Sequence, residues 1–194
     1  MVNVSTSKWI SFVAVMAALG NALSFVSIQL SPLVPSIPLG PVSVSLALDF
    51  SHLATFIAAF LGGPIVGGLA GLIGGFVAAF EFGFSQGNWI SGIGIPIGKA
   101  MTGVAAGLLF KSLRSGRLKI LAATAISYIP EAIFTAIIFV YLLPVFYGLP
   151  QVVAMVLAIQ VVVKAYIEML IMGTILAYIT GSKGFQTFTR SFRM

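Results

Sequence analysis

LDFSHLATFIAAFLGGPIVGGLAGLIGGFVAAFEF, residues 48–82, is the stretch of this chain that decides its fold. It is apolar over most of its length and carries only scattered polar residues. A helix of about 20 apolar residues spans the hydrocarbon core of a lipid bilayer. Together with the residues just before it, we divide the stretch into two membrane spans, 44–62 and 64–83. The stretch therefore predicts a membrane protein.

The rest of the chain has the same character. Hydrophobic residues make up 59% of the 194 residues and charged residues only 7%, which excludes an ordinary soluble domain. Because apolar runs of this length suit helices rather than barrel strands, six transmembrane helices are expected. We place them at 9–28, 44–62, 64–83, 94–110, 119–143 and 150–180. The sequence thus predicts an all-α membrane protein, one membrane-embedded domain over residues 1–194, without room for a soluble catalytic domain.

Positive charge is distributed unevenly around these six segments. It occurs before the first segment, in the loop after the fourth, and after the sixth: Lys8, Lys111, Arg114, Arg117, Lys119, Lys183, Arg190 and Arg193. The loops 29–43, 84–93 and 144–149 carry no charge. The positive-inside rule therefore predicts that both termini are cytoplasmic. Lys8 and the apolar run after it also fit a signal peptide, but an even number of spans favours retention of the segment.

The first uncharged loop, 29–43, has a proline at every third position: Pro32, Pro35, Pro38 and Pro41. This spacing suits a stiff, polyproline-like strap. The strap is either a simple connector or a lid over a site that faces outward.

Small residues recur every four positions on three segments. The first two stripes are Gly63, Gly67, Gly71, Gly75 and Ala79, and then Gly94, Gly98, Thr102 and Ala106. Because such stripes let helix backbones approach closely, we expect both to pack within the protein. The third stripe is Ala14, Ala18 and Ala22 on the first segment. It either packs within the protein as well or provides a docking face for a partner.

All four acidic residues, Asp49, Glu81, Glu131 and Glu168, lie inside apolar segments. An acid at the centre of a membrane helix costs about 2.5–3.5 kcal/mol on insertion scales, so these acids are expected to bind a ligand, relay protons or lock helices together. Lys164 and Glu168 are four residues apart and can form an ion pair on one helix face. Lys99 can neutralise either Asp49 or Glu81 on another helix.

Two further polar positions stand out. Glu131 follows Pro130, where a helix loses a backbone hydrogen bond and can kink. Non-helical backbone in a membrane is tolerated only inside protein or along a cavity, which makes Glu131 a candidate for the wall of a polar pocket. Asp49 and His52 are three residues apart and can form either a plain buried hydrogen-bonded pair or a proton relay.

Several other kinds of site are not expected. The chain has no cysteine, its single histidine lacks the neighbours of a metal site, and no GxxxxGK[ST] phosphate loop is present. The net charge of +6 does not indicate nucleic acid, because the basic residues do not form a soluble face. We expect no catalytic residues, no metal and no cofactor, and hence no enzyme.

Two segments resemble a known family. LDFSHL (Leu48–Leu53) and AAFLGGPIVGGLAGLIGG (Ala58–Gly75) are similar to the helix-two and helix-three signature of the substrate-binding S components of energy-coupling factor (ECF) vitamin transporters. KAMTGVAAGLLFK (Lys99–Lys111) and Lys164 extend the likeness, which covers nearly the whole chain. The DFS segment is most similar to the riboflavin and related vitamin subfamilies.

The chain also departs from that signature. Ala54 stands where the family has a proline, and Gly75 and Phe76 stand where it has an acidic residue. The resemblance implies a multi-pass protein of a prokaryotic cell membrane that binds a water-soluble vitamin. It also implies a transmembrane T component and two ATP-binding subunits as partners, which hydrolyse the ATP. Docking onto the T component would use the first-segment stripe, Ala14, Ala18 and Ala22.

The implied vitamin pocket lies near the outer face, between the last three segments and under the first loop. We expect contacts to the substrate from Glu131, Lys164 and Lys99, with secondary contacts from Gln160, Asn88 and Trp89. The lysines would meet acceptor or anionic groups, and Glu131 would accept from a ring N–H or a hydroxyl. The main alternative is a stand-alone proton-coupled carrier that uses Asp49, His52 and Glu131 as a relay. A third possibility is a membrane assembly subunit without a ligand.

Overall fold

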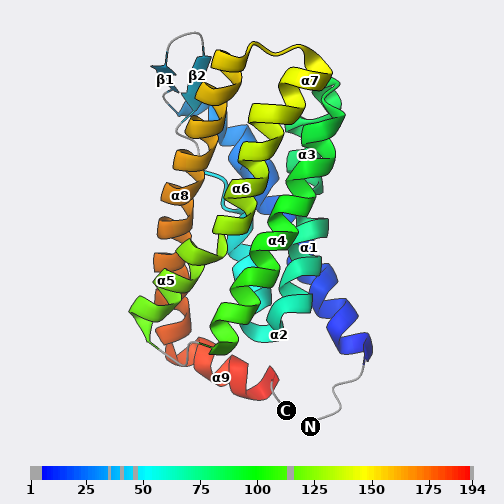
Figure 1. Ribbon diagram of the computed structural model, residues 1–194. Helices are drawn as coiled ribbons and strands as arrows, with labels where there is room; N and C mark the ends of the chain where they lie inside the picture. The colour runs from blue at the N-terminus through cyan, green and yellow to red at the C-terminus, as the bar shows by residue number, and fades with distance from the viewer. Residues whose placement is uncertain (1–5, 35, 40–41, 46–47, 113–115, 193–194) are drawn as a thin grey trace.

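The computed structural model describes residues 6–34, 36–39, 42–45, 48–112 and 116–192. Long helices pack side by side into a bundle (Figure 1). The described helices are α1 (Thr6–Leu30), α2 (Ser51–Gly74), α3 (Phe76–Phe82), α4 (Trp89–Ser112), α5 (Arg117–Ser127), α6 (Ile129–Ile137), α7 (Leu143–Tyr147), α8 (Gln151–Gly181) and α9 (Lys183–Phe192). A π-helical turn, Ile138–Leu142, joins α6 to α7, and 3₁₀ turns lie at Ser31–Leu33 and Phe84–Gln86.

Within the described residues, five helical runs are long and apolar enough to cross a membrane. They are Ser7–Leu33, Ser51–Gln86, Trp89–Ser112, Arg117–Tyr147 and Gln151–Gly181. Large apolar side chains are exposed all along these runs, as expected for helices that face lipid rather than water. The chain is therefore a multi-pass membrane protein.

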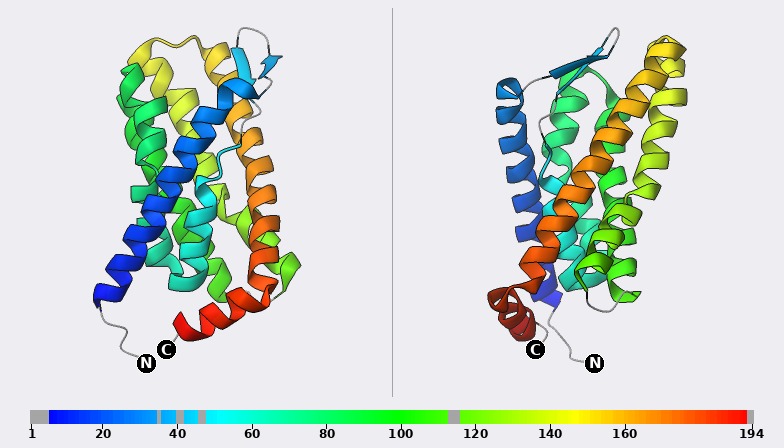
Figure 2. Two further views of the ribbon diagram at one scale, coloured as in Figure 1. Left: turned by 180° about the vertical axis from the view of Figure 1, so that it is seen from behind. Right: turned by 90° about the vertical axis from the view of Figure 1, so that its left-hand side faces the viewer.

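The second of these runs folds back on itself at Gly63, whose φ of 78° and ψ of −167° are not helical. In a straight helix, Ala54 and Gly74 would be about 30 Å apart. Instead both lie against Gly20: a Cβ built on Gly20 would be 3.3 Å from the Gly74 Cα and 3.7 Å from the Ala54 Cβ. Residues 51–62 and 64–74 are thus antiparallel arms, and the cyan-to-green colouring of Figure 2 follows the reversal.

This reversal falls at the boundary expected between the spans 44–62 and 64–83. The first arm differs from the expected helix, because α2 begins only at Ser51. An arm of residues 51–62 is about 18 Å long, shorter than the ~30 Å hydrocarbon core, so it covers only part of a membrane pass. The residues before it, 48–50, are not helical and lie inside the bundle.

A β-hairpin qualifies one expectation from sequence and corrects another. β1 (Ser36–Leu39) pairs with β2 (Val42–Ser45) in antiparallel register, with Ser36 opposite Ser45 and Leu39 opposite Val42. The fold is helical as expected apart from this hairpin, and this part of the loop 29–43 is not a polyproline strap. Pro38 is tolerated because both strands of a two-stranded sheet are edge strands. Pro32 lies in the 3₁₀ turn, and Pro35 and Pro41 fall outside the described residues.

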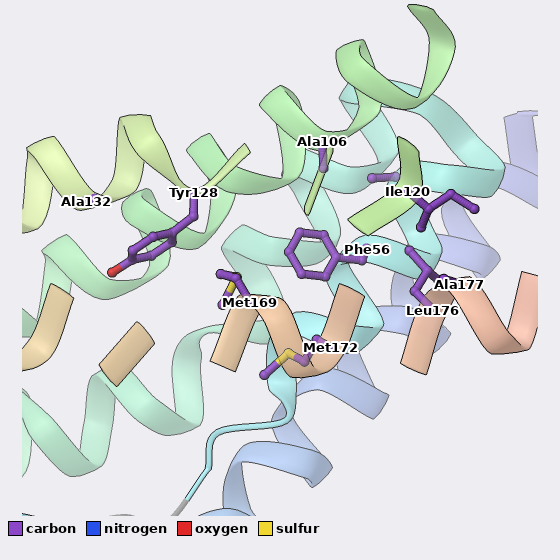
Figure 3. Packing of buried hydrophobic residues seen from close by; sticks show 10 residues of the cluster. Phe56, Ala106, Ile120, Tyr128, Ala132, Met169, Met172, Leu176 and Ala177 are labelled. Atoms are coloured by element: carbon purple, nitrogen blue, oxygen red, sulfur yellow. The ribbon is translucent and has the colours of Figure 1, made fainter. Parts of the chain in front are cut away.

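Both small-residue stripes pack within the protein, as expected: that of α2 lies against α4, and that of α4 faces α6 and the π-helical turn after it. A Cβ on Gly67 would lie 2.6 Å from the Gly103 carbonyl oxygen, and a Cβ on Gly75 would lie 3.0 Å from the Pro96 Cα. Only glycine allows backbones to meet at this distance. A second group of buried residues, which includes Phe56, Tyr128 and Met169, joins α2, α5 and α6 to α8 (Figure 3). These contacts fix the positions of α4, α6 and α8 around the first arm of α2.

The two ends of the bundle differ. The start of α1 and the whole of α9 lie at one end, and the β-hairpin and α7 lie at the other (Figures 1 and 2). We call them the basic end and the hairpin end, because the described residues Lys8, Lys111, Arg117, Lys119 and Lys183 belong to elements that meet at the former. The cytoplasmic location of the basic end stays a prediction.

Candidate functional site

A polar network fills the middle of the bundle, and Asp49 is its centre. The Asp49 amide donates to Glu168 Oε1 at 2.9 Å, and its Oδ1 accepts the amide of Ser51 at 3.0 Å. Its Oδ2 lies 3.0 Å from the ammonium Nζ of Lys99, which also donates to the Ser51 hydroxyl. Asp49 therefore accepts from the first amide of α2 and neutralises Lys99, which confirms one of the two partners expected for that lysine.

Glu131 forms a second part of the network. Its Oε2 accepts a hydrogen bond from the Thr102 hydroxyl at 2.6 Å and lies 3.1 Å from His52 Nε2. All three side chains are buried. The expected pairing of His52 with Asp49 is therefore wrong: the first turn of α2 points His52 toward α6, whereas Asp49, which precedes the helix, bonds to Lys99 on α4.

The break expected near Pro130 is confirmed. α5 ends at Ser127 and α6 begins at Ile129, with Pro130 in its first turn. Proline suits this position because it has no N–H to leave unpaired. Glu131 follows it in the same turn, where the helix N-terminus favours a negative charge. The break thus positions Glu131 in the centre of the bundle.

Lys164 and Glu168 form the expected pair on α8, with 3.7 Å between Nζ and Oε1. The two differ in burial: 32% of the Lys164 side chain is exposed, against 7% for Glu168. Glu168 also accepts the amide of Asp49, so it connects α8 to the non-helical residues before α2. Lys164 has the longer contact and the freer side chain of the two lysines inside the bundle.

Gln160 lies two turns from Glu168 on α8 and is the exception in this network. It is 8% exposed, and neither its amide oxygen nor its amide nitrogen has a hydrogen-bond partner among the described residues. The same holds for His52 Nδ1. A buried polar group left without a partner costs about 1–3 kcal/mol, so such groups are rare and need a reason.

Two contacts set the level of Gln160 in the bundle. Near the hairpin end, the Gln151 side chain donates to the Val140 carbonyl at 3.0 Å. Nearer the basic end, the rings of Tyr128 and Tyr166 meet edge to face at 5.1 Å. Since α8 runs antiparallel to α5–α7, Gln160 lies between these contacts, close to the level of the first turns of α6. It is therefore level with the Glu131 part of the network.

Asn88 and Trp89 lie elsewhere. The Asn88 side chain accepts the amide of Ser91 at 3.0 Å and so caps α4. Trp89 is exposed, packs edge to face against Phe84, and donates its backbone amide to the Tyr147 hydroxyl at 2.9 Å. Both are about 15 Å along α4 from Lys99. The structure therefore brings Glu131, Lys99, Lys164 and Gln160 to one region and leaves these two at the hairpin end.

Two members of the network were not identified from sequence. Thr102 was read only as a small residue of the α4 stripe, and His52 was assigned to the wrong acid. Neither carried a signal, because both contact Glu131 across helices far apart in the chain. Glu81, the fourth acid, lies on the exposed end of α3 rather than in the network. Among the described residues, no group of three or more histidines and acids is placed to hold a metal ion.

The alanine stripe of α1 faces away from the bundle. Ala14, Ala18 and Ala22 are all exposed, whereas Ala17 is 2% exposed and Gly20 packs against α2. The expectation that the stripe packs within the protein is therefore wrong. Within the described residues it is a strip of small side chains on the outer surface, bordered by the exposed Val15 and Leu19.

Comparison with known proteins gives one family and one fold. A model of the family "ECF transporter, substrate-specific component" matches residues 12–180, which is most of the chain. The solved structure described as "Structure and mechanism of the S component of a bacterial ECF transporter" is similar in fold, with a TM-score of 0.53, 20% sequence identity and 97% of each chain covered. The comparison with curated proteins gave no match. Because the family model covers far more than half of the chain, the protein belongs to the substrate-specific components of ECF transporters.

Proposed function

We propose that this S component binds a water-soluble vitamin in the region between the polar network and the hairpin end. Members of the family are substrate-binding subunits of transporters and not themselves enzymes. The proposal rests on which polar groups in the bundle already have hydrogen-bond partners and which do not. Asp49, Ser51, Thr102 and Glu131 are bonded to one another or to His52 and Lys99, whereas Gln160 has no partner among the described residues and Lys164 is partly exposed.

The residues take different roles in this proposal. Lys164 and Gln160 contact the ligand, because they have hydrogen-bonding capacity to offer. Glu131 and Lys99 hold the wall of the site, since their charges are already used within the protein. Asn88 and Trp89 belong to the rim at the hairpin end. Among vitamins, the DFS segment at Asp49 favours riboflavin.

We further propose that transport is driven by ATP through a T component and two ATP-binding subunits. The exposed stripe of α1 supports this, because small residues on a lipid-facing helix allow a second helix to approach closely. Family membership argues against the stand-alone proton-coupled carrier. Uptake into proteoliposomes that depends on the T component, both ATP-binding subunits and ATP is the expected result.

Vitamin binding is tested with the purified protein. Native mass spectrometry should show one small molecule bound, and titration with vitamins should give a dissociation constant in the nanomolar range. Lys164→Ala should weaken that binding at least tenfold, because it removes a cation from a partly desolvated site. Lys183→Ala, at the start of α9, is the matched control and should bind normally. Equal affinity of Lys164→Ala and the wild type would remove Lys164 from the site.

A further inference from the structure

The glutamine side chains of this chain differ in burial and in hydrogen bonding. The side chains of Gln86, Gln151 and Gln186 donate to the main-chain carbonyls of Glu81, Val140 and Gly181, although all three glutamines are exposed to the surroundings. Gln160 is more than nine-tenths buried, yet its amide has no partner among the described residues. An exposed glutamine can bond to its surroundings whether or not the protein supplies a partner, whereas at the buried Gln160 a missing partner is costly.

A primary amide places a donor and an acceptor side by side. To satisfy both atoms of Gln160 at once, a ligand must present the opposite pair: an acceptor opposite the NH₂ and a donor opposite the oxygen. A carboxylate only accepts and an ammonium only donates, so either one would leave half of the buried amide unpaired. An edge with N–H next to C=O, as in a lactam, an imide or a carboxamide, satisfies both atoms.

The surroundings of Gln160 agree with such a ligand. Lys164 is one turn further along α8, with its ammonium 3.7 Å from Glu168 and its side chain partly exposed, so it can donate to a further acceptor on the same molecule. Nearer the hairpin end, at the level of Gln151, the π-helical turn Ile138–Leu142 packs against α8, and such turns are frequent at functional sites. The Glu131 carboxylate lies at a similar level but already accepts from Thr102.

We propose that Gln160 is the specificity-determining residue of this S component and recognises a ligand edge that carries N–H and C=O side by side. The inference rests on the proposed function, since it needs a small molecule in this region, and it goes further by naming the chemical group that is read. It makes nicotinamide, biotin and riboflavin acceptable in principle, because each carries a carboxamide, urea or imide with N–H and C=O on one edge. It makes nicotinate, pyridoxine and pantothenate poor ligands: the first two have no amide, and the trans amide of pantothenate points its N–H and C=O in opposite directions.

The test measures binding of these six compounds to the wild type, Gln160→Met and Gln151→Met. Methionine keeps the length and unbranched shape of glutamine but removes both hydrogen-bonding atoms. The wild type should bind a member of the first group, Gln160→Met should lose at least tenfold in affinity for it, and Gln151→Met, at the start of the same helix, should lose less than threefold. Preferred binding of nicotinate, pyridoxine or pantothenate, or equal affinity in Gln160→Met, would overturn the inference while leaving vitamin binding intact.

A second readout separates ligand recognition from a structural role. Because the amide is unpartnered without ligand, Gln160→Met should keep or raise the melting temperature of the ligand-free protein and should lower only the increase caused by the bound compound. A ligand-free Gln160→Met that melts below the wild type would mean that a buried water or the protein itself satisfies the amide, and the inference would fail. If none of the six compounds binds the wild type, the inference fails; the proposed vitamin function fails as well only if native mass spectrometry also shows no bound vitamin.

Discussion

The ion pair between Lys99 and Asp49 gives the sharpest test of the polar network. Lys99→Met keeps the length of the side chain and removes its charge, so Asp49 loses the ammonium 3.0 Å away. Breaking a buried ion pair by removing one partner costs about 3–5 kcal/mol. Because 28% of the Asp49 side chain is exposed, we expect the lower end of that range, about 3 kcal/mol. At ~2–4 °C per kcal/mol for a chain of this size, the melting temperature should fall by about 6–12 °C.

The assay is thermal unfolding of the detergent-purified protein, carried out as a double-mutant cycle with Asp49→Asn. Asparagine keeps the acceptor for the Ser51 amide but not the charge. The double variant Lys99→Met/Asp49→Asn should therefore be more stable than Lys99→Met alone, because no uncompensated charge is left in the bundle. Vitamin affinity of the double variant then decides the role of Lys99: we expect it to be close to that of the wild type.

Two results would refute this reasoning. If Lys99→Met melts within about 1 °C of the wild type, the pair does not stabilise the bundle. If the double variant recovers its stability but no longer binds any vitamin, Lys99 contacts the ligand directly and is not only part of the wall.

Two further predictions concern α1 and the chain reversal. Ala18→Leu should abolish co-purification of the T component and leave vitamin affinity unchanged, because Ala18 is exposed on the outer face of α1. Val15→Leu, on the same exposed side, is the control. Normal assembly of Ala18→Leu would exclude the stripe as the docking face. Gly63→Ala should destabilise the protein by about 1–3 kcal/mol through backbone strain alone, since a Cβ there meets nothing within 4 Å. Gly148→Ala is the comparison: a Cβ there also meets nothing within 4 Å, but the left-handed φ of 63° and ψ of 23° are better tolerated by non-glycine residues. A larger loss of stability in Gly148→Ala than in Gly63→Ala would contradict the argument.

Much of the fold follows from features that are local in sequence. The apolar runs predicted where the membrane segments lie, and the observed reversal at Gly63 falls at the predicted boundary. The small-residue stripes of α2 and α4 predicted close contacts within the protein, and the Lys164–Glu168 pair followed from a spacing of four residues. Pro130 predicted the break before α6. The β-hairpin did not follow, because four prolines in one loop suggest an extended strap more strongly than they suggest paired strands.

The candidate site depended on contacts between helices. The sequence identified Lys99, Glu131, Gln160 and Lys164 as candidates, since they are polar residues within apolar segments. It could not decide that Asp49 binds Lys99 while His52 binds Glu131, because that choice depends on which helix faces each side of α2. Nor could it separate Asn88 and Trp89 from the others.

The sequence by itself thus determined that the protein lies in a lipid bilayer, where its membrane segments are, and which polar residues they contain. It could do so because hydrophobicity and helical spacing act locally. Only the tertiary structure decided which of those polar residues neutralise one another, which face of α1 the alanine stripe occupies, and that the amide of Gln160 has no partner among the described residues. These are properties of helix rotation and packing, and they arise only when segments far apart in the chain meet.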